Sequence, residues 1–165
     1  EIAADQGLSL RFEKRFNADE CKFKAHGRDV FLQKPQTFMN RSGQSVAALA
    51  RYYKIAVEEI LVIHDELDLP PGVNRIKQSG GHGGHNGIRD VIGHCGADFM
   101  RLRLGVGHPG DKERVTGYVL QQASKDIEAA VMRNIDEAMD VVPMLVEGGL
   151  NAAMKALHTQ AADRA

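Results

Sequence analysis

A short run of four apolar residues, Ile60 to Ile63, constrains the fold of this chain more than any other feature. The run lacks polar alternation and is too short for a typical helix, so it predicts a strand that is buried on both faces. Acidic residues follow in His64-Asp65-Glu66-Leu67-Asp68, and Pro70-Pro71-Gly72 then turns the chain. Because such a strand needs helices on both sides of its sheet, the run favours an α/β domain.

Strands and helices interleave along the rest of the chain, which indicates a mostly buried, mixed sheet. The length of 165 residues corresponds to about one domain. A hairpin is expected where residues 21–26 alternate, with a turn at Gly27-Arg28-Asp29. Further strands are expected at 73–78 and 100–106, and further helices after Gly43, at 88–93, from Ser124 to a stop or kink at Pro143, and at 150–157.

Composition excludes several classes of protein. The net charge of −1 argues against a basic coat for nucleic acid or membrane, and no apolar run approaches the roughly 18 residues of a membrane span. Cys21 and Cys95 lie far apart without a CxxC pair, which suits reduced thiols in the cytoplasm. Residues 69–115 carry seven Lys or Arg against four Asp or Glu, so a phosphate group is best sought there.

The acidic segment after the apolar run is one candidate for chemistry. Acidic residues at the carboxyl end of a strand lie at the rim where α/β proteins bind ligands. Asp65 is placed to orient a histidine, because a carboxylate fixes the tautomer of an imidazole and stabilises its charged form. The alternative is a solvated acidic turn ahead of the prolines.

A second candidate is the glycine-rich segment from Gly80 to Gly87. It matches neither the phosphate-binding P-loop nor the dinucleotide fingerprint. Dense glycine lets a backbone approach a ligand closely, and Asn86 offers both a hydrogen-bond donor and an acceptor. The alternative, a plain flexible connector, leaves the asparagine and the two histidines of this segment unexplained.

Those histidines also raise the possibility of a metal site. His82 and His85 have HxxH spacing, and Asp65 or His64 could supply a third ligand. A glycine loop holds such ligands less rigidly than a helix does, which weakens this interpretation.

Two basic residues on separate predicted strands form the last candidate. If the strands are neighbours, Lys77 and Arg103 could bracket a phosphate group. The alternative is an ordinary solvated face of the sheet.

Four segments together resemble the bacterial peptidyl-tRNA hydrolases, in the order and spacing of that family and across essentially the whole chain. They are Lys34-Pro35-Gln36-Thr37-Phe38-Met39-Asn40-Arg41-Ser42-Gly43, His64-Asp65-Glu66-Leu67-Asp68-Leu69-Pro70-Pro71-Gly72, Gly81-His82-Gly83-Gly84-His85-Asn86-Gly87 and Arg101-Leu102-Arg103-Leu104-Gly105-Val106-Gly107-His108-Pro109-Gly110.

The resemblance implies a monomeric, cytoplasmic α/β enzyme whose single domain, residues 1–165 here, has a twisted mixed sheet surrounded by helices. It implies hydrolysis of the ester bond between a peptide and the 3′ ribose of tRNA, which recycles tRNA in translation. The family acts without a metal or other cofactor, so the resemblance argues against a zinc site.

Site residues follow from the resemblance position by position. Asp65 matches the carboxylate that stabilises the basic form of the catalytic histidine. Phe38, Asn40 and Asn86 match positions that contact the tRNA end or order the attacking water, and His85 is a weaker candidate. A separate pair, Lys77 and Arg103, resembles the family's clamp on the tRNA 5′ phosphate.

The sequence departs from the family at its start. The family opens with a strand, an Asn-Pro-Gly turn and a Thr-Arg-His-Asn segment that supplies the catalytic histidine, and none of these is found here. We expect that the sequence lacks an N-terminal segment of about one strand and half a helix. This explanation is preferred to the evolution of an inactive variant. The alternatives are a non-catalytic module that binds the tRNA end and, less favoured, a zinc-dependent hydrolase.

Overall fold

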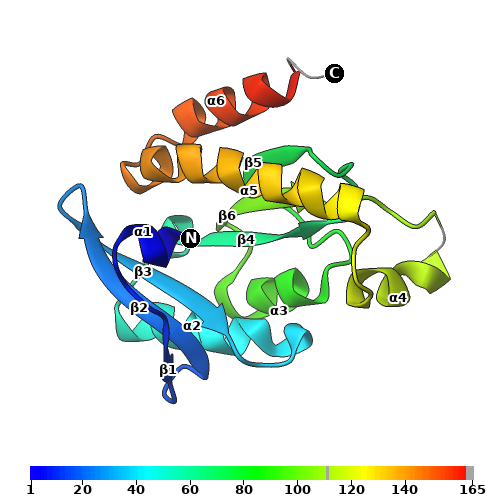
Figure 1. Ribbon diagram of the computed structural model, residues 1–165. Helices are drawn as coiled ribbons and strands as arrows, with labels where there is room; N and C mark the ends of the chain where they lie inside the picture. The colour runs from blue at the N-terminus through cyan, green and yellow to red at the C-terminus, as the bar shows by residue number, and fades with distance from the viewer. Residues whose placement is uncertain (111, 163–165) are drawn as a thin grey trace. The chain divides into compact units, whose positions relative to one another are not determined.

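The computed structural model describes residues 1–110 and 112–162 and has the α/β class expected from the sequence (Figure 1). Its contacts divide the chain into two compact units. The first comprises Glu1–Leu61 and Gln78–Met100, and the second Val62–Lys77 and Arg101–Ala165. The strands form two three-stranded sheets, where the sequence suggested a single mixed one.

The first sheet is an antiparallel meander in the order β1-β2-β3, formed by Arg11–Glu13, Ala18–Ala25 and Arg28–Pro35. The hairpin of β2 and β3 was expected, but its turn is displaced from the predicted position. Ala25 pairs with Arg28, which leaves His26 and Gly27 as a two-residue loop with φ angles of 51° and 74°. Two positive φ angles are required by the type I′ turn, whose twist matches that of the flanking strands.

The helical part of the first unit comprises α1 (Ile2–Asp5), η1 (Met39–Arg41), α2 (Ser42–Tyr52), η2 (Val57–Glu59) and α3 (Asn86–Cys95). Helices α2 and α3 pack against each other, and β3 is tied to α2 where the amide Nε2 of Gln33 donates to the carbonyl oxygen of Ser45 at 3.1 Å. Helix α3 begins earlier and ends later than the predicted 88–93 and runs through Gly93, which has open space around its Cα.

The second sheet has the order β4-β6-β5, formed by Leu61–Glu66, Met100–Gly105 and Asn74–Gln78. The amide N–H groups of Met100 and Val106 donate to the carbonyl oxygens of Ile60 and Glu66, so β4 and β6 are parallel. The N–H groups of Gly105 and Ser79 donate to the carbonyl oxygens of Val73 and Phe99, so β5 is antiparallel to β6. The sheet is therefore mixed, as expected.

Strand β4 differs from the prediction in two respects. It extends through His64, Asp65 and Glu66, which the sequence placed in a turn after the strand. The side chain of Ile63 is 45% exposed, so β4 is not buried on both faces along its whole length. Among the described strands, β4 pairs with β6 alone and lies at the edge of this sheet.

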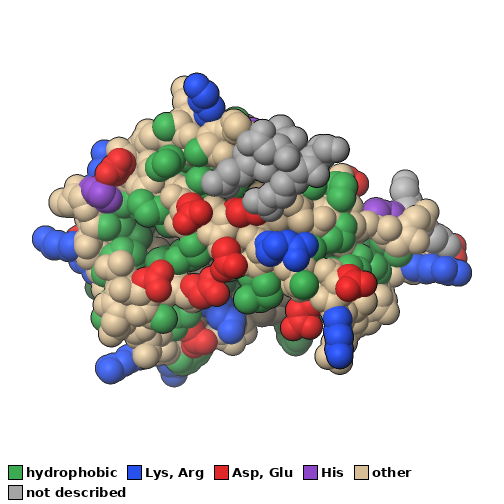
Figure 2. Space-filling model, turned by 45° about the horizontal axis from the view of Figure 1, so that its top comes forward, with side chains coloured by type: hydrophobic (Ala, Val, Ile, Leu, Met, Phe, Trp, Pro, Cys, Tyr) green, Lys and Arg blue, Asp and Glu red, His purple; other side chains and the backbone are tan. Residues whose placement is uncertain are grey.

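The remaining helices of the second unit are η3 (Lys112–Arg114), α4 (Val115–Leu120), α5 (Lys125–Val146) and α6 (Leu150–Ala162). As expected, Ser124 caps α5, where its hydroxyl oxygen accepts from the N–H of Ile127 at 3.4 Å. The sequence predicted a stop or kink at Pro143. The helix continues three residues beyond Pro143, so this proline lies in its last turn. Exposed acidic side chains gather on the outer face of α5 (Figure 2).

Helix α5 covers one face of the second sheet (Figure 1). Its buried residues recur with helical spacing from Ala130 to Leu145, and the amide Nδ2 of Asn74 on β5 donates to the carbonyl oxygen of Asn134 on α5 at 2.7 Å. Helix α6 packs against α5. Within the described residues, no helix is long and apolar enough to cross a bilayer.

Candidate functional site

Asn40 and Asn86, 46 positions apart in the chain, line one groove of about 340 Å³ in the first unit. We call this groove, lined by Asn40, Asn86, Arg89, Asp90, Gly93 and His94, the amide groove. Both asparagines are exposed. The groove thus presents two uncharged side chains that can each donate and accept hydrogen bonds.

Local structure fixes each asparagine at the start of a helical element. Asn40 lies in η1, immediately before α2, and Asn86 is the first residue of α3. His85 caps α3, since its Nδ1 accepts from the N–H groups of Gly87 and Ile88 at 3.1 and 3.2 Å. The proton of a neutral His85 ring is therefore on Nε2, and the ring holds the turn that carries Asn86.

The close approach of α2 and α3 brings the two asparagines together. The N–H of Gly43 donates to Oδ2 of Asp90 at 2.8 Å, and a Cβ atom on Gly43 would collide with the carbonyl oxygen of Asp90. At the start of α3, a Cβ on Gly87 would lie 2.6 Å from Sδ of Met39. Only glycine at position 43 allows the backbones to come this close without displacement.

Apolar side chains lie on the segment that carries Asn40. Phe38 is 78% exposed and Met39 is 58% exposed. Large exposed apolar side chains beside a polar groove are typical of a surface that contacts a ligand. The structure thus leaves Phe38 accessible, as its predicted role at the tRNA end requires.

Four residues of the amide groove were missed from the sequence, namely Arg89, Asp90, Gly93 and His94. A signal was present, because Arg89, Asp90 and Gly93 follow Asn86 by three, four and seven positions. That spacing places them on the same helix face once α3 is known to begin at Asn86 rather than at Ile88. The error in the helix boundary therefore concealed the groove.

The second unit brings Lys77 and Arg103 together on neighbouring strands, as the phosphate interpretation required. Burial lowers the pKa of the Lys77 ammonium, Arg103 and Arg101 lower it further, and Glu66 opposes the shift. We call Lys77, Arg101 and Arg103 the cation cluster. Of the groups that shift the pKa of Lys77, two are cations and one is a carboxylate, so positive charge predominates around this ammonium and suits an anion.

The cation cluster is more enclosed than a solvated sheet face. Arg101 is only 1% exposed, and Lys77 and Arg103 are half-buried. The Nε atom of Arg103 is buried without a hydrogen-bond partner among the described residues. Since a buried donor is costly unless it is satisfied, this atom favours a ligand that accepts hydrogen bonds.

Asp65 is half-buried in β4, in the second unit. Alternation along the strand directs its side chain to the side opposite Glu66, the residue that acts on Lys77. His64 also alternates with Asp65, and its Nδ1 lies 2.7 Å from the carbonyl oxygen of Asp65. Asp65 and Glu66 therefore project from opposite sides of β4.

The possible metal ligands have other partners in the structure. Nδ1 of His82 accepts from the N–H of Gly84 at 3.0 Å, and Nδ1 of His85 caps α3. Among the described residues, no three His, Cys, Asp or Glu side chains gather in a group that could hold a metal ion.

Comparison with known proteins identifies the family. The peptidyl-tRNA hydrolase family model matches residues 1–164. The peptidyl-tRNA hydrolase of Marinobacter nauticus is 50% identical over 96% of this chain and 81% of its own length, and that of Pseudomonas savastanoi is 52% identical over 98% and 84%. The crystal structure of the Acinetobacter baumannii peptidyl-tRNA hydrolase matches with a TM-score of 0.91 at 46% identity, over 94% of this chain and 80% of that chain. The chain therefore belongs to the peptidyl-tRNA hydrolase family.

Proposed function

We propose that the protein hydrolyses the ester bond between peptide and tRNA in peptidyl-tRNA, which returns the tRNA to translation. The observation that carries the proposal is the amide groove, in which Asn40 and Asn86 lie together in a chain of this family. The relatives named as peptidyl-tRNA hydrolases are 50–52% identical to it, which supports the same activity.

The reaction requires a positioned water and a proton acceptor. The water oxygen attacks the ester carbonyl carbon, and the bond to the ribose 3′ oxygen breaks. A general base takes the proton of the water and returns it to the departing 3′ oxygen, which yields a peptide acid and a tRNA with a free 3′ hydroxyl. Asn40 and Asn86 orient the water and donate to the oxyanion, and their amides stay uncharged at any pH.

Asp65 supports the general base in this proposal. The family resemblance implies a catalytic histidine, and a carboxylate beside it holds the required tautomer and stabilises the imidazolium that forms. Asp65 acts through that histidine without contacting the substrate. Its place in β4, a hydrogen-bonded strand, provides the rigid support that such a role needs.

Substrate binding is assigned to Phe38 in the first unit and, separately, to Lys77 and Arg103 in the second. The exposed ring of Phe38 offers a face on which a nucleotide can stack. Lys77 and Arg103 bind the 5′ phosphate, whose negative charge compensates the excess of cations. His85 contributes by holding the start of α3, and hence Asn86, through its cap.

The proposal treats residues 1–165 as one peptidyl-tRNA hydrolase-like domain, acting as a cytoplasmic monomer without a metal or other cofactor. The family match over residues 1–164 supports the single-domain assignment.

The test is turnover of N-blocked aminoacyl-tRNA by the intact protein. We expect release of free tRNA and the blocked amino acid at a rate that a metal chelator does not change. Binding of the substrate without turnover would favour the tRNA-end binding function instead, and loss of turnover with chelator would favour a zinc-dependent hydrolase.

A further inference from the structure

The outer edge of strand β5 is covered by a histidine from the last helix. Among the strands of the described residues, β5 pairs with β6 alone, so no described strand pairs with its other edge. At that edge, the N–H of Ile76 donates to Nε2 of His158 on α6 at 3.2 Å, across 82 positions of sequence. A side chain on α6 thus takes the place of a strand partner at Ile76.

This hydrogen bond requires the neutral form of His158. Nε2 can accept only when it carries no proton, so the ring must have its proton on Nδ1. Burial lowers the pKa of the imidazole, and Arg75 on β5 and Arg103 on β6 lower it further. An imidazolium at this position would lose the hydrogen bond from Ile76. It would also lie near the positive charges of Arg75 and Arg103.

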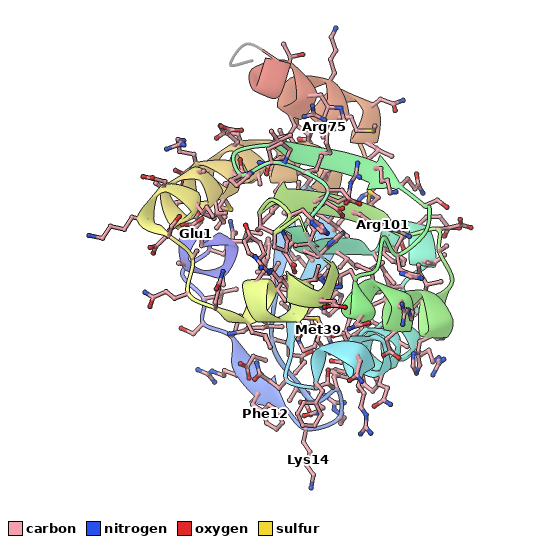
Figure 3. All side chains as sticks on the ribbon, turned by 90° about the vertical axis from the view of Figure 1, so that its right-hand side faces the viewer. Glu1, Phe12, Lys14, Met39, Arg75 and Arg101 are labelled. Atoms are coloured by element: carbon pink, nitrogen blue, oxygen red, sulfur yellow. The ribbon has the colours of Figure 1, made fainter. Side chains whose placement is uncertain are left out.

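The residue next to Ile76 in the chain is Lys77, a member of the cation cluster. Alternation along β5 puts Arg75 and Lys77 on the same face, and Figure 3 shows Arg75 beside α6. Arg103 acts on both His158 and Lys77. Because Arg75, Lys77 and Arg103 repel one another, an anchor on β5 helps the hydrogen bonds of the sheet to hold this part of the strand in place.

We propose that His158 is a positioning residue for tRNA binding, whose neutral imidazole anchors β5 at Ile76 and so sets the spacing of Lys77 and Arg103 for a phosphate group. The inference rests on the proposed function, because it assumes that Lys77 and Arg103 bind the 5′ phosphate of the substrate. His158 itself does not contact the substrate.

Two variants of the intact protein separate this role from a merely structural one. His158→Ala removes the acceptor, whereas the side-chain oxygen of His158→Gln can reach a position close to that of Nε2 and accept the same N–H. Thr159→Ala is the matched control, since the Thr159 hydroxyl donates to the carbonyl oxygen of Lys155 in its own helix.

The measurement is kcat and KM on N-blocked aminoacyl-tRNA with its 5′ phosphate, and on the same substrate after the phosphate has been removed. For His158→Ala we expect KM to rise roughly five- to tenfold on the phosphorylated substrate, the size expected for loss of one hydrogen bond, with kcat unchanged. KM on the dephosphorylated substrate should not change. The glutamine variant should restore the normal KM, and Thr159→Ala should match the wild type.

The pH dependence provides a second readout that also serves if His158→Ala does not fold. As the pH falls below the ordinary histidine value of about 6.5, the wild type should progressively lose its preference for the phosphorylated substrate. His158→Gln should lose less of that preference, because an amide does not titrate. The phosphate also gains a proton in this range, and the glutamine variant controls for that loss of charge.

Several results would overturn the proposal. They are an equal rise of KM on both substrates, a fall in kcat alone, no effect of His158→Ala, or the same pH profile for the wild type and His158→Gln. If the wild type binds the phosphorylated tRNA with the expected dependence on His158 but does not hydrolyse it, the proposed function fails and the role of His158 stands. Hydrolysis that is indifferent to both variants refutes the role of His158 alone.

Discussion

The amide groove and the cation cluster differ in the elements that form them and in the charge that they present. The groove lies between helical elements and presents the exposed, uncharged side chains of Asn40 and Asn86. The cluster is formed on adjacent strands and keeps its cations partly or fully out of solvent. An uncharged amide directs hydrogen bonds without changing the charge of the site, whereas clustered cations attract an anion from any direction. Under the proposed function, the groove therefore acts on the rate and the cluster on the affinity for tRNA.

The largest expected effect is on rate and concerns Asp65. Asp65→Asn should lower kcat by roughly 10²–10⁴-fold while tRNA affinity and folding stay close to normal, because the variant loses the charge that supports the imidazolium. Single-turnover kinetics on N-blocked aminoacyl-tRNA, with affinity measured separately, would check this. Asp68→Asn, an exposed acid three residues away, is the control. Near-normal turnover of the Asp65 variant would remove this residue from the mechanism.

A smaller loss of rate is expected at the groove itself. Asn86→Ala should reduce kcat about 10²–10³-fold, the usual result of removing a donor to a developing oxyanion. The loss should be the same at low and high salt, because the amide is uncharged. Kinetics at two ionic strengths would check both statements, with Asn151→Ala near the start of α6 as the control. If the loss of kcat depended on salt, Asn86 would act in electrostatic binding, and the contrast between the amide groove and the cation cluster would fail.

The cation cluster should respond in the opposite manner. Lys77→Ala and Arg103→Ala should each weaken substrate binding about 10- to 100-fold, as expected for a charged hydrogen bond, with kcat retained. Each should also reduce the slope of log affinity against log salt by just under about one unit. Binding titrations at several salt concentrations would measure this, with Arg133→Ala on the exposed side of α5 as the control. Equal losses on substrates without a 5′ phosphate would show that these residues support the fold instead.

The smallest expected effect is on stability and tests how the groove is assembled. Gly43→Ala should lower the free energy of unfolding by about 1–3 kcal/mol, because the added methyl group meets the carbonyl oxygen of Asp90. Gly117→Ala adds the same methyl group to α4 where there is open space, and it should leave stability equal or slightly higher. Thermal or denaturant unfolding of the two variants would compare them. If Gly43→Ala were as stable as Gly117→Ala, α2 and α3 could move apart without a loss in the free energy of unfolding.

The sequence predicted elements with a strong local pattern and missed those without one. The apolar run at Ile60–Ile63 and the capped helix from Ser124 were both recognisable. Strand β1 has only three residues and α4 contains Gly117, so neither has a clear periodicity. The position of the turn at His26 and Gly27 depended on the pairing of β2 with β3, which propensity alone does not determine.

The same limit applied to the sites. Lys77 and Arg103 were proposed as a pair on condition that their strands were neighbours, and only the sheet order settled that condition. The groove depended on the packing of α2 against α3, which unites residues far apart in the chain. Nothing near His158 in the sequence pointed to Ile76, because that contact arises only when α6 lies against the edge of β5.

The contact between α6 and β5 also bears on how the protein resists aggregation. A strand edge with free N–H and C=O groups is a template on which another chain can add its own strand. His158 occupies the N–H of Ile76, one of the groups that such a chain would use. If α6 detaches, through heating or acid, that group becomes available for intermolecular pairing. The last helix, while it stays in place, therefore helps to keep folded molecules from pairing through the edge of β5.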